Sequence, residues 1–128
     1  MKKLGIGVDI IENLRIKRSI TNKRFLTRVF SNTEITNSKK TTNKTGYFSK
    51  RFAAKEAFTK ALGTGINKET ILKNIEVRND LRGKPYINLK GKANSFLKKK
   101  IKKNKYNIYL SLSDDIPWAQ ATVIISFN

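Results

Sequence analysis

One long amphipathic helix limits the folds that are open to this chain of 128 residues. Between about Tyr47 and Leu62 the apolar side chains recur at the spacing of one helix face. Gly63 follows, and glycine commonly ends a helix in the left-handed backbone conformation. Other elements must cover the apolar side of such a helix, so we predict a single domain over residues 1–128 with helices and sheet in two layers. The side chains that we expect to face its core are Phe48, Phe52, Ala54, Phe58 and Leu62.

Residues 4–9 have the two-residue period of a strand, in which apolar side chains alternate with Gly5, Gly7 and Asp9. The glycines leave one side of this strand almost bare. We therefore expect a ligand to approach the backbone on that side, next to the carboxylate of Asp9.

Shorter patterns predict the remaining elements. Helical spacing over residues 10–20 groups Ile10, Leu14 and Ile20, and a second short helix follows at 23–30. The "SNTE" segment, residues 31–34, matches a capping box and predicts another helix start. The expected fold class is α+β, with a mostly antiparallel sheet and helices packed on one face. The other expected elements are strands at 74–80, 85–89, 106–113 and 118–127 and a basic helix at 92–103.

The charge of the chain indicates an anionic partner. It has 28 Lys and Arg against 9 Asp and Glu, a formal net charge of +19, which attracts nucleic acid, anionic membranes, phosphorylated small molecules or acidic proteins. Cys and His are absent, which excludes thiol chemistry and imidazole acid–base chemistry, and any metal would bind carboxylate oxygens. No apolar segment approaches membrane-spanning length, so we expect no membrane association and a cytoplasmic location.

One acid stands among the cations of the long helix. Glu56 and Lys60 are four residues apart and share a helix face, which by itself indicates only a weak surface ion pair. A functional interpretation adds Asp9, because two carboxylates with water and substrate phosphate make a typical Mg²⁺ site. Lys55 and Lys60 would then hold the phosphates. The backbone amides of the turn after the helix would approach phosphate oxygens as well, and that turn is Gly63, Thr64 and Gly65.

Two segments resemble the signatures of a known family. "GIGVDIIEN" (5–13) and "FSKRFAAKEAFTKALGTGI" (48–66) closely resemble those of the holo-acyl-carrier-protein synthases, in the 4′-phosphopantetheinyl transferase superfamily. Smaller matches at "SNTE", "IEVRND", "GKPYINL" and "LSLS…AQATVII" extend the resemblance over nearly the whole chain. The resemblance implies transfer of 4′-phosphopantetheine from coenzyme A to a serine of apo acyl carrier protein, in support of fatty acid biosynthesis. The other product would be adenosine 3′,5′-bisphosphate.

The resemblance also implies roles for individual residues. Asp9 and Glu56 would bind Mg²⁺ with the coenzyme A pyrophosphate, and Lys60 would lie against phosphate as a catalytic group. Glu56 is also our candidate for the base that takes the serine proton, directly or through a metal-bound water, whereas for Glu34 we favour capping alone. The family implies a homotrimer with each site between neighbouring subunits. The cations expected to dock the acidic carrier protein are Arg15, Lys23, Arg24 and Arg28.

The chain departs from the family pattern before its last strand. The family usually has a histidine near coenzyme A phosphate in "SxSH" or "SxTH", whereas "SLSDD" places Asp114 at that position. An anion beside phosphate is unfavourable unless it turns away or a lysine shields it. The departure concerns how the 3′-phosphate is held.

Two other functions are compatible with parts of the sequence. A small nucleic-acid-binding protein would explain the charge, but the aromatic residues have core spacing and form no stacking platform. A carrier-protein-binding module without activity would explain the missing histidine, but Asp9, Glu56 and Lys60 are all retained. A transfer assay with apo acyl carrier protein distinguishes all three.

Overall fold

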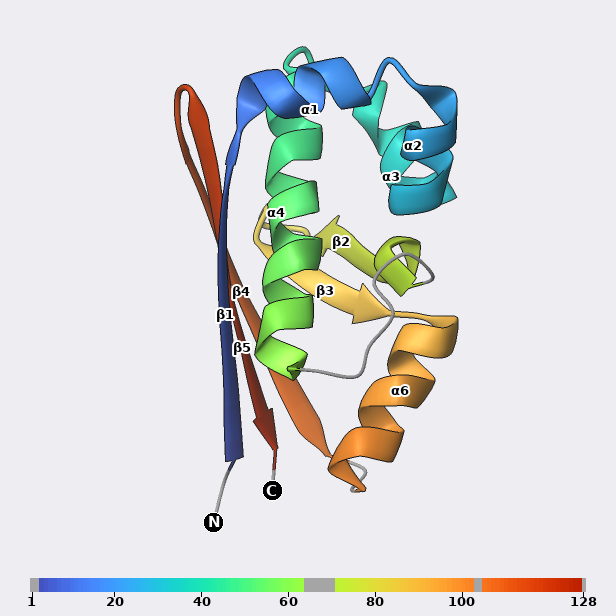
Figure 1. Ribbon diagram of the computed structural model, residues 1–128, viewed down its shortest axis with the longest axis vertical. Helices are drawn as coiled ribbons and strands as arrows, with labels where there is room; N and C mark the ends of the chain where they lie inside the picture. Colours follow the sequence, from blue (N-terminus) through green and yellow to red (C-terminus); the bar gives the residue numbers. More distant parts are fainter. Residues whose placement is uncertain (1–2, 64–70, 103–104, 128) are drawn as a thin grey trace.

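Helix α4 (Lys44–Leu62) forms the centre of the computed structural model, between a sheet and a layer of shorter elements (Figure 1). The structure describes residues 3–63, 71–102 and 105–127. Twelve of the 19 residues of α4 are buried, because neighbours cover most of its circumference. All five apolar side chains that the sequence predicted to face the core are among the buried residues.

The main sheet has three antiparallel strands in the order β1-β5-β4. Its register places Asp9 of β1 opposite Ala121 of β5, which in turn lies opposite Leu112 of β4. A separate antiparallel hairpin, β2-β3, lies on the other side of α4 (Figure 1). The predicted antiparallel strands are therefore confirmed, but they form two sheets. The strands are β1 (Lys3–Glu12), β2 (Ile75–Asn79), β3 (Pro85–Leu89), β4 (Tyr106–Asp115) and β5 (Trp118–Phe127).

The shorter helices lie on the same side of the main sheet as α4, as the sequence predicted. In Figure 1, α1 crosses one end of α4, and α6 lies near its other end. A complete capping box at Ser31 and Glu34 starts α3, which confirms that prediction. These elements are α1 (Asn13–Ser19), α2 (Lys23–Val29), α3 (Asn32–Ser38), the 3-10 helix η1 (Leu72–Asn74) and α6 (Gly91–Ile101).

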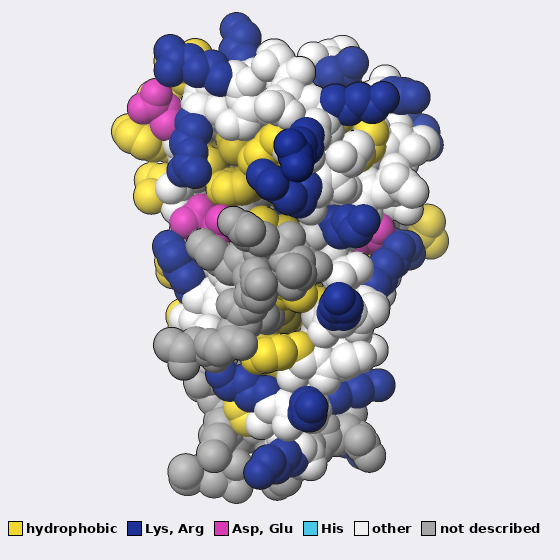
Figure 2. Space-filling view, turned by 45° about the vertical axis from the view of Figure 1, so that its right-hand side comes forward, with side chains coloured by type: hydrophobic (Ala, Val, Ile, Leu, Met, Phe, Trp, Pro, Cys, Tyr) yellow, Lys and Arg dark blue, Asp and Glu magenta, His cyan; other side chains and the backbone are white. Residues whose placement is uncertain are grey.

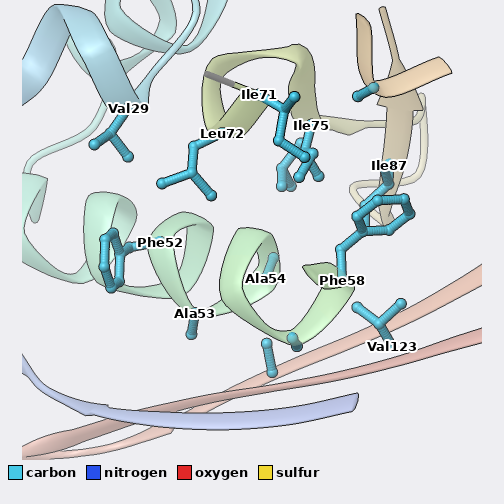
Figure 3. Close-up of a cluster of buried hydrophobic side chains, with 14 of the residues drawn as sticks. Val29, Phe52, Ala53, Ala54, Phe58, Ile71, Leu72, Ile75, Ile87 and Val123 are labelled. Carbon is cyan, nitrogen blue, oxygen red and sulfur yellow. The ribbon is translucent and has the colours of Figure 1, made fainter. Parts of the chain in front are cut away.

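The core has two parts, one on each side of α4. Figure 3 shows Ala53 pointing toward the strands of the main sheet, while Leu72, Ile71 and Ile75 lie on the opposite side of the helix. Small residues face the sheet, and Ala53 and Ala57 are completely buried there. The helix can therefore lie very close to β1.

The glycines of β1 permit this close approach. A Cβ atom added at Gly7 would overlap the carbonyl oxygen of Ala57, and one added at Gly5 would overlap that of Ala61. Our expectation that a ligand approaches this glycine side is therefore wrong, because α4 occupies it.

The first helix was predicted too early in the chain. Residues 10–12 continue β1, because Ile10 and Ile11 pair with Gln120 and Ala119 of β5. The buried residue of α1 is Ile16, whereas Leu14, which we grouped with Ile10, is largely exposed. Gly63 does end α4 with a positive φ of 94°, but its ψ of −153° is extended and not left-handed helical.

Candidate active site

A contact between Lys60 and Asp9 joins the two segments from which the metal and phosphate site was predicted. The Lys60 ammonium on α4 donates to Asp9 Oδ1 at 3.1 Å and to the backbone carbonyl of Val8 at 3.0 Å, both on β1. The lysine side chain is 55% exposed and the aspartate side chain 16%. Because β1 is an edge strand, this contact lies where a ligand can reach it.

Glu56 precedes Lys60 by one helical turn and is partly buried. Its neighbour Ala57 is the residue whose carbonyl oxygen lies against Gly7 of β1. The two predicted carboxylates thus come from adjacent elements and offer hard oxygen donors. Within the described ranges no three Asp, Glu, His or Cys side chains gather into a metal cluster. A set of two carboxylates fits Mg²⁺, which completes its coordination with water and substrate oxygens.

Lys55 does not lie in this site, and the prediction that it holds phosphate is wrong. Its side chain is completely buried. The ammonium donates to Glu34 Oε1 at 2.8 Å and to the backbone carbonyls of Leu72 and Ile75 at 2.9 and 2.7 Å. Burial lowers the pKa of Lys55, and the adjacent Glu34 carboxylate opposes that shift. All three donors of the ammonium are engaged within the protein, so none is left for a phosphate.

Glu34 does more than cap α3. Its Oε1 accepts from the backbone amide of Ser31 at 2.9 Å as well as from Lys55, and its Oε2 accepts from the amide of Val77 at 2.9 Å. The side chain is completely buried. We missed this role, although a lysine in a helix that is covered on most sides indicates a buried acid elsewhere.

A second buried carboxylate belongs to the β2-β3 hairpin. Glu76 accepts from Lys90 at 3.0 Å and from the Arg78 guanidinium, and both cations are partly exposed. Burial raises its pKa, but hydrogen bonds from Ser31, Lys90 and Arg78 outweigh burial and lower the pKa to about 2.

The predicted docking cations lie on the surface of α1 and α2. Arg15, Lys23, Arg24 and Arg28 are all exposed. The guanidinium of Arg15 lies 5.7 Å from the ring centre of Phe52, which limits where it can point. Figure 2 shows Lys and Arg side chains over the end of the molecule where these helices lie and along the rest of this face.

Asp114 lies at the opposite edge of the main sheet from Asp9, on β4. Lys50 of α4 approaches its carboxylate at 3.7 Å. A lysine therefore shields this anion, which is one of the two possibilities that the sequence left open. Of the predicted phosphate turn, Gly63 is exposed, while Thr64 and Gly65 lie outside the described residues.

Comparison with known proteins identifies the superfamily of the chain. Residues 5–117 match the 4′-phosphopantetheinyl transferase superfamily. The chain belongs to this superfamily. It is 50% identical over 125 residues to the holo-[acyl-carrier-protein] synthase of Pelagibacter ubique, covering 98% of both chains.

Solved structures of the superfamily have the same fold. The chain resembles the coenzyme A complex of the synthase from Chronobacterium ammoniagenes with a TM-score of 0.87 and 26% identity over 98% of both chains. It resembles the Bacillus anthracis holo-(acyl-carrier-protein) synthase, in complex with coenzyme A (3′,5′-ADP), with a TM-score of 0.77 and 36% identity, covering 97% of this chain and 96% of that one. The α+β fold expected from the sequence is thus confirmed. No helix in the described parts of the chain is long and apolar enough to span a membrane.

Proposed function

We propose that this chain transfers 4′-phosphopantetheine from coenzyme A to a serine hydroxyl of apo acyl carrier protein and releases adenosine 3′,5′-bisphosphate. The observation that carries the proposal is the contact between Lys60 and Asp9, which joins both signature segments at one exposed strand edge. The names of the relatives and the coenzyme A complexes of two similar structures support it.

Two carboxylates of the chain would hold the metal. Asp9 and Glu56 would bind Mg²⁺ together with the coenzyme A pyrophosphate, and the ion would supply neutralisation of the charge on the leaving bisphosphate. Glu56 is the group that we assign to take the proton of the attacking serine. These roles fit a displacement at phosphorus, which depends on position and charge more than on covalent help.

Lys60 has the freedom that a phosphate ligand requires. Its side chain is more than half exposed, and its partner Asp9 is the residue that would bind the metal. We propose that its ammonium exchanges Asp9 for a phosphate oxygen when the substrate binds. The lysine would then support the negative charge on the attacked phosphoryl group.

The arrangement of the main sheet supports a homotrimer. Asp9 and Asp114 lie on the two edge strands, so a head-to-tail ring of copies would place the Asp9 edge of one copy beside the Asp114 edge of its neighbour. The side of the sheet turned away from α4 bears Ile6, Val8 and Ile10 of β1, which are 61%, 49% and 61% exposed. An apolar row of this kind is typical of a surface that another subunit covers.

Carrier-protein docking is assigned to the four exposed cations of α1 and α2. They form a positive surface at one end of the molecule, which would attract an acidic partner. The cytoplasmic location and the role in fatty acid biosynthesis stay predictions.

One assay tests the reaction and separates the alternatives. The protein is incubated with apo acyl carrier protein, coenzyme A and Mg²⁺, and the carrier protein is weighed by mass spectrometry. A gain matching phosphopantetheine supports transfer. Binding of the carrier protein without that gain would indicate an inactive binding module, and salt-sensitive binding of nucleic acid without either would indicate a nucleic-acid-binding protein.

A further inference from the structure

We infer that Lys55 and Glu34 form a buried positioning pair, which fixes the rotation of α4 and thereby the place of Glu56 and Lys60 at the edge of β1. The inference deepens the proposed transferase function and rests on it. Neither residue touches the substrate in this scheme. They act through the helix that carries the reacting groups.

The contacts of the pair reach four separate segments. Lys55 on α4 meets Glu34 of α3 and two carbonyl oxygens, that of Leu72 at the start of η1 and that of Ile75 at the start of β2. Glu34 continues the network to the amide of Val77 on β2. Both side chains are completely buried, so water cannot replace any of these hydrogen bonds. The position of Lys55 is therefore determined from several directions at once.

The pair lies across the helix from the candidate site. Lys55 and Lys60 are five residues apart, which separates them by about 140° around the helix axis. The side of α4 near Lys55 faces η1, and Figure 3 shows Leu72 and Ile75 across the helix from the main sheet. On the sheet side, the backbone of α4 lies against Gly5 and Gly7. Contact with the glycines sets the depth of the helix, and the ion pair sets its rotation.

On the sheet side of α4, hydrophobic packing fixes this rotation poorly. The side of α4 that faces the sheet carries Ala53 and Ala57, which are small and interlock little with their neighbours. A buried ion pair adds a directional constraint, and that is the role for which buried charges have the best support, since their net contribution to stability is often small. Glu56 and Lys60 follow the same rotation, and a shift of about 1 Å in a reacting group can cost about 100-fold in rate.

The test compares two buried carboxylates whose ion pairs connect different elements of the fold. Glu34→Gln weakens the pair with Lys55 on α4, whereas the control Glu76→Gln weakens ion pairs with Arg78 and Lys90 in the β2-β3 hairpin and the residue after it. The control also loses the hydrogen bond from Ser31 at the start of α3, but it leaves the direct contact between Glu34 and Lys55 in place. Lys55→Met and the double variant Glu34→Gln with Lys55→Met complete the set. The double variant removes both charges, so it avoids the uncompensated buried carboxylate of Lys55→Met.

Each protein is assayed below its own thermal midpoint, with each substrate varied separately. The affinity for coenzyme A with Mg²⁺ is measured by calorimetry without carrier protein. We expect Lys55→Met and the double variant to lose at least about tenfold in kcat and in coenzyme A affinity, with the carrier-protein KM within about twofold of wild type. Glu34→Gln should lose less, and Glu76→Gln should keep wild-type kinetics.

The double variant separates positioning from mere destabilisation. If it regains thermal stability over Lys55→Met but not turnover, the positioning role is supported. If turnover returns together with stability, or if Glu76→Gln loses as much activity as the α4 variants, the inference is wrong. If Lys55→Met does not fold, the double variant decides the question by the same criteria. A wild-type protein that transfers nothing rejects the proposed function and the inference, whereas an active wild type with an unaffected double variant rejects only the inference.

Discussion

Lys55 and Lys60 are the same residue type, in the same helix, with an acid at a similar distance. The Lys55 ammonium lies 2.8 Å from Glu34 and the Lys60 ammonium 3.1 Å from Asp9. Their surroundings differ, because the first pair is completely buried, whereas Lys60 of the second pair is more than half exposed at a strand edge. Proximity to an acid therefore does not identify the functional lysine.

Burial determines what each pair can do. An exposed ion pair contributes about 0–1 kcal/mol to stability, so Lys60 can leave Asp9 at little cost and move to a ligand. The loss of one member of a buried pair typically costs about 3–5 kcal/mol, so Lys55 cannot leave Glu34. One lysine is available for chemistry, and the other maintains the structure around it.

The largest effect is expected at the two carboxylates of the exposed site. Asp9→Ala and Glu56→Ala should each remove nearly all transfer, because no His or Cys in the chain can replace a lost carboxylate oxygen. The fold should remain, since neither residue is fully buried. Mass spectrometry of the carrier protein and circular dichroism check the two expectations. Near-normal Mg²⁺-dependent turnover in both variants would show that the site is assigned wrongly.

The second largest effect is expected on stability, where substitutions of the two lysines should differ. Lys55→Met should lower the free energy of unfolding by about 3–5 kcal/mol, because it leaves Glu34 charged and buried without a cation. Lys60→Met should lower it by less than about 1 kcal/mol. Urea unfolding of both variants, followed by circular dichroism, measures the difference. Equal losses in the two proteins would contradict the contrast between the pairs.

A cation outside both pairs should affect only one substrate. Arg15→Glu reverses a charge on the proposed docking surface, so the apparent KM for acyl carrier protein should rise strongly while the KM for coenzyme A changes little. Raised salt should have the same effect on the wild type, because the screening length falls from about 10 Å at 0.1 M to about 3 Å at 1 M. Steady-state kinetics with each substrate varied in turn provides the measurement. An equal loss toward both substrates would argue against docking at α1.

The smallest effect concerns acid stability and Glu76. Its pKa is about 2 in the folded protein against an ordinary 4.5, so the folded state binds fewer protons than the unfolded state in this range. The stabilisation is complete above about pH 4.5 and declines as the pH falls toward 2. Glu76→Gln should lack this part of the acid dependence, as measured by thermal midpoints between pH 6 and about pH 2.5. Parallel curves for the variant and the wild type would show that Glu76 does not titrate this way.

Local patterns in the sequence predicted much of the fold. The apolar spacing of α4 and the capping box at Ser31 and Glu34 depend on residues within a few positions of one another, and both predictions were confirmed. Ile10 was assigned wrongly, because its pairing with Gln120 of β5 outweighs helical spacing. That partner is more than 100 positions away in the chain, and no local pattern reveals it.

The candidate site was predictable to a similar degree. Spacing on one helix placed Glu56 and Lys60 together, and the structure adds the contact with Asp9. The buried environment of Lys55 could not be predicted in this way, because its partners are brought to it by α3, η1 and β2. The basic composition also concealed it, since a lysine among 28 cations is expected at the surface.

The contact of α4 with Gly5 and Gly7 has a consequence for assigning function to distant members of the superfamily. A chain with every acid and lysine of the site, but with alanine at position 7, could not bring its helix to the same depth on β1. Its charged residues would match the signature, but the helix that carries Glu56 and Lys60 would lie farther from Asp9. The glycines of "GIGVD" should therefore be checked together with the aspartate that follows them before the proposed function is assigned to such a chain, although glycine has no side chain that could take part in a reaction.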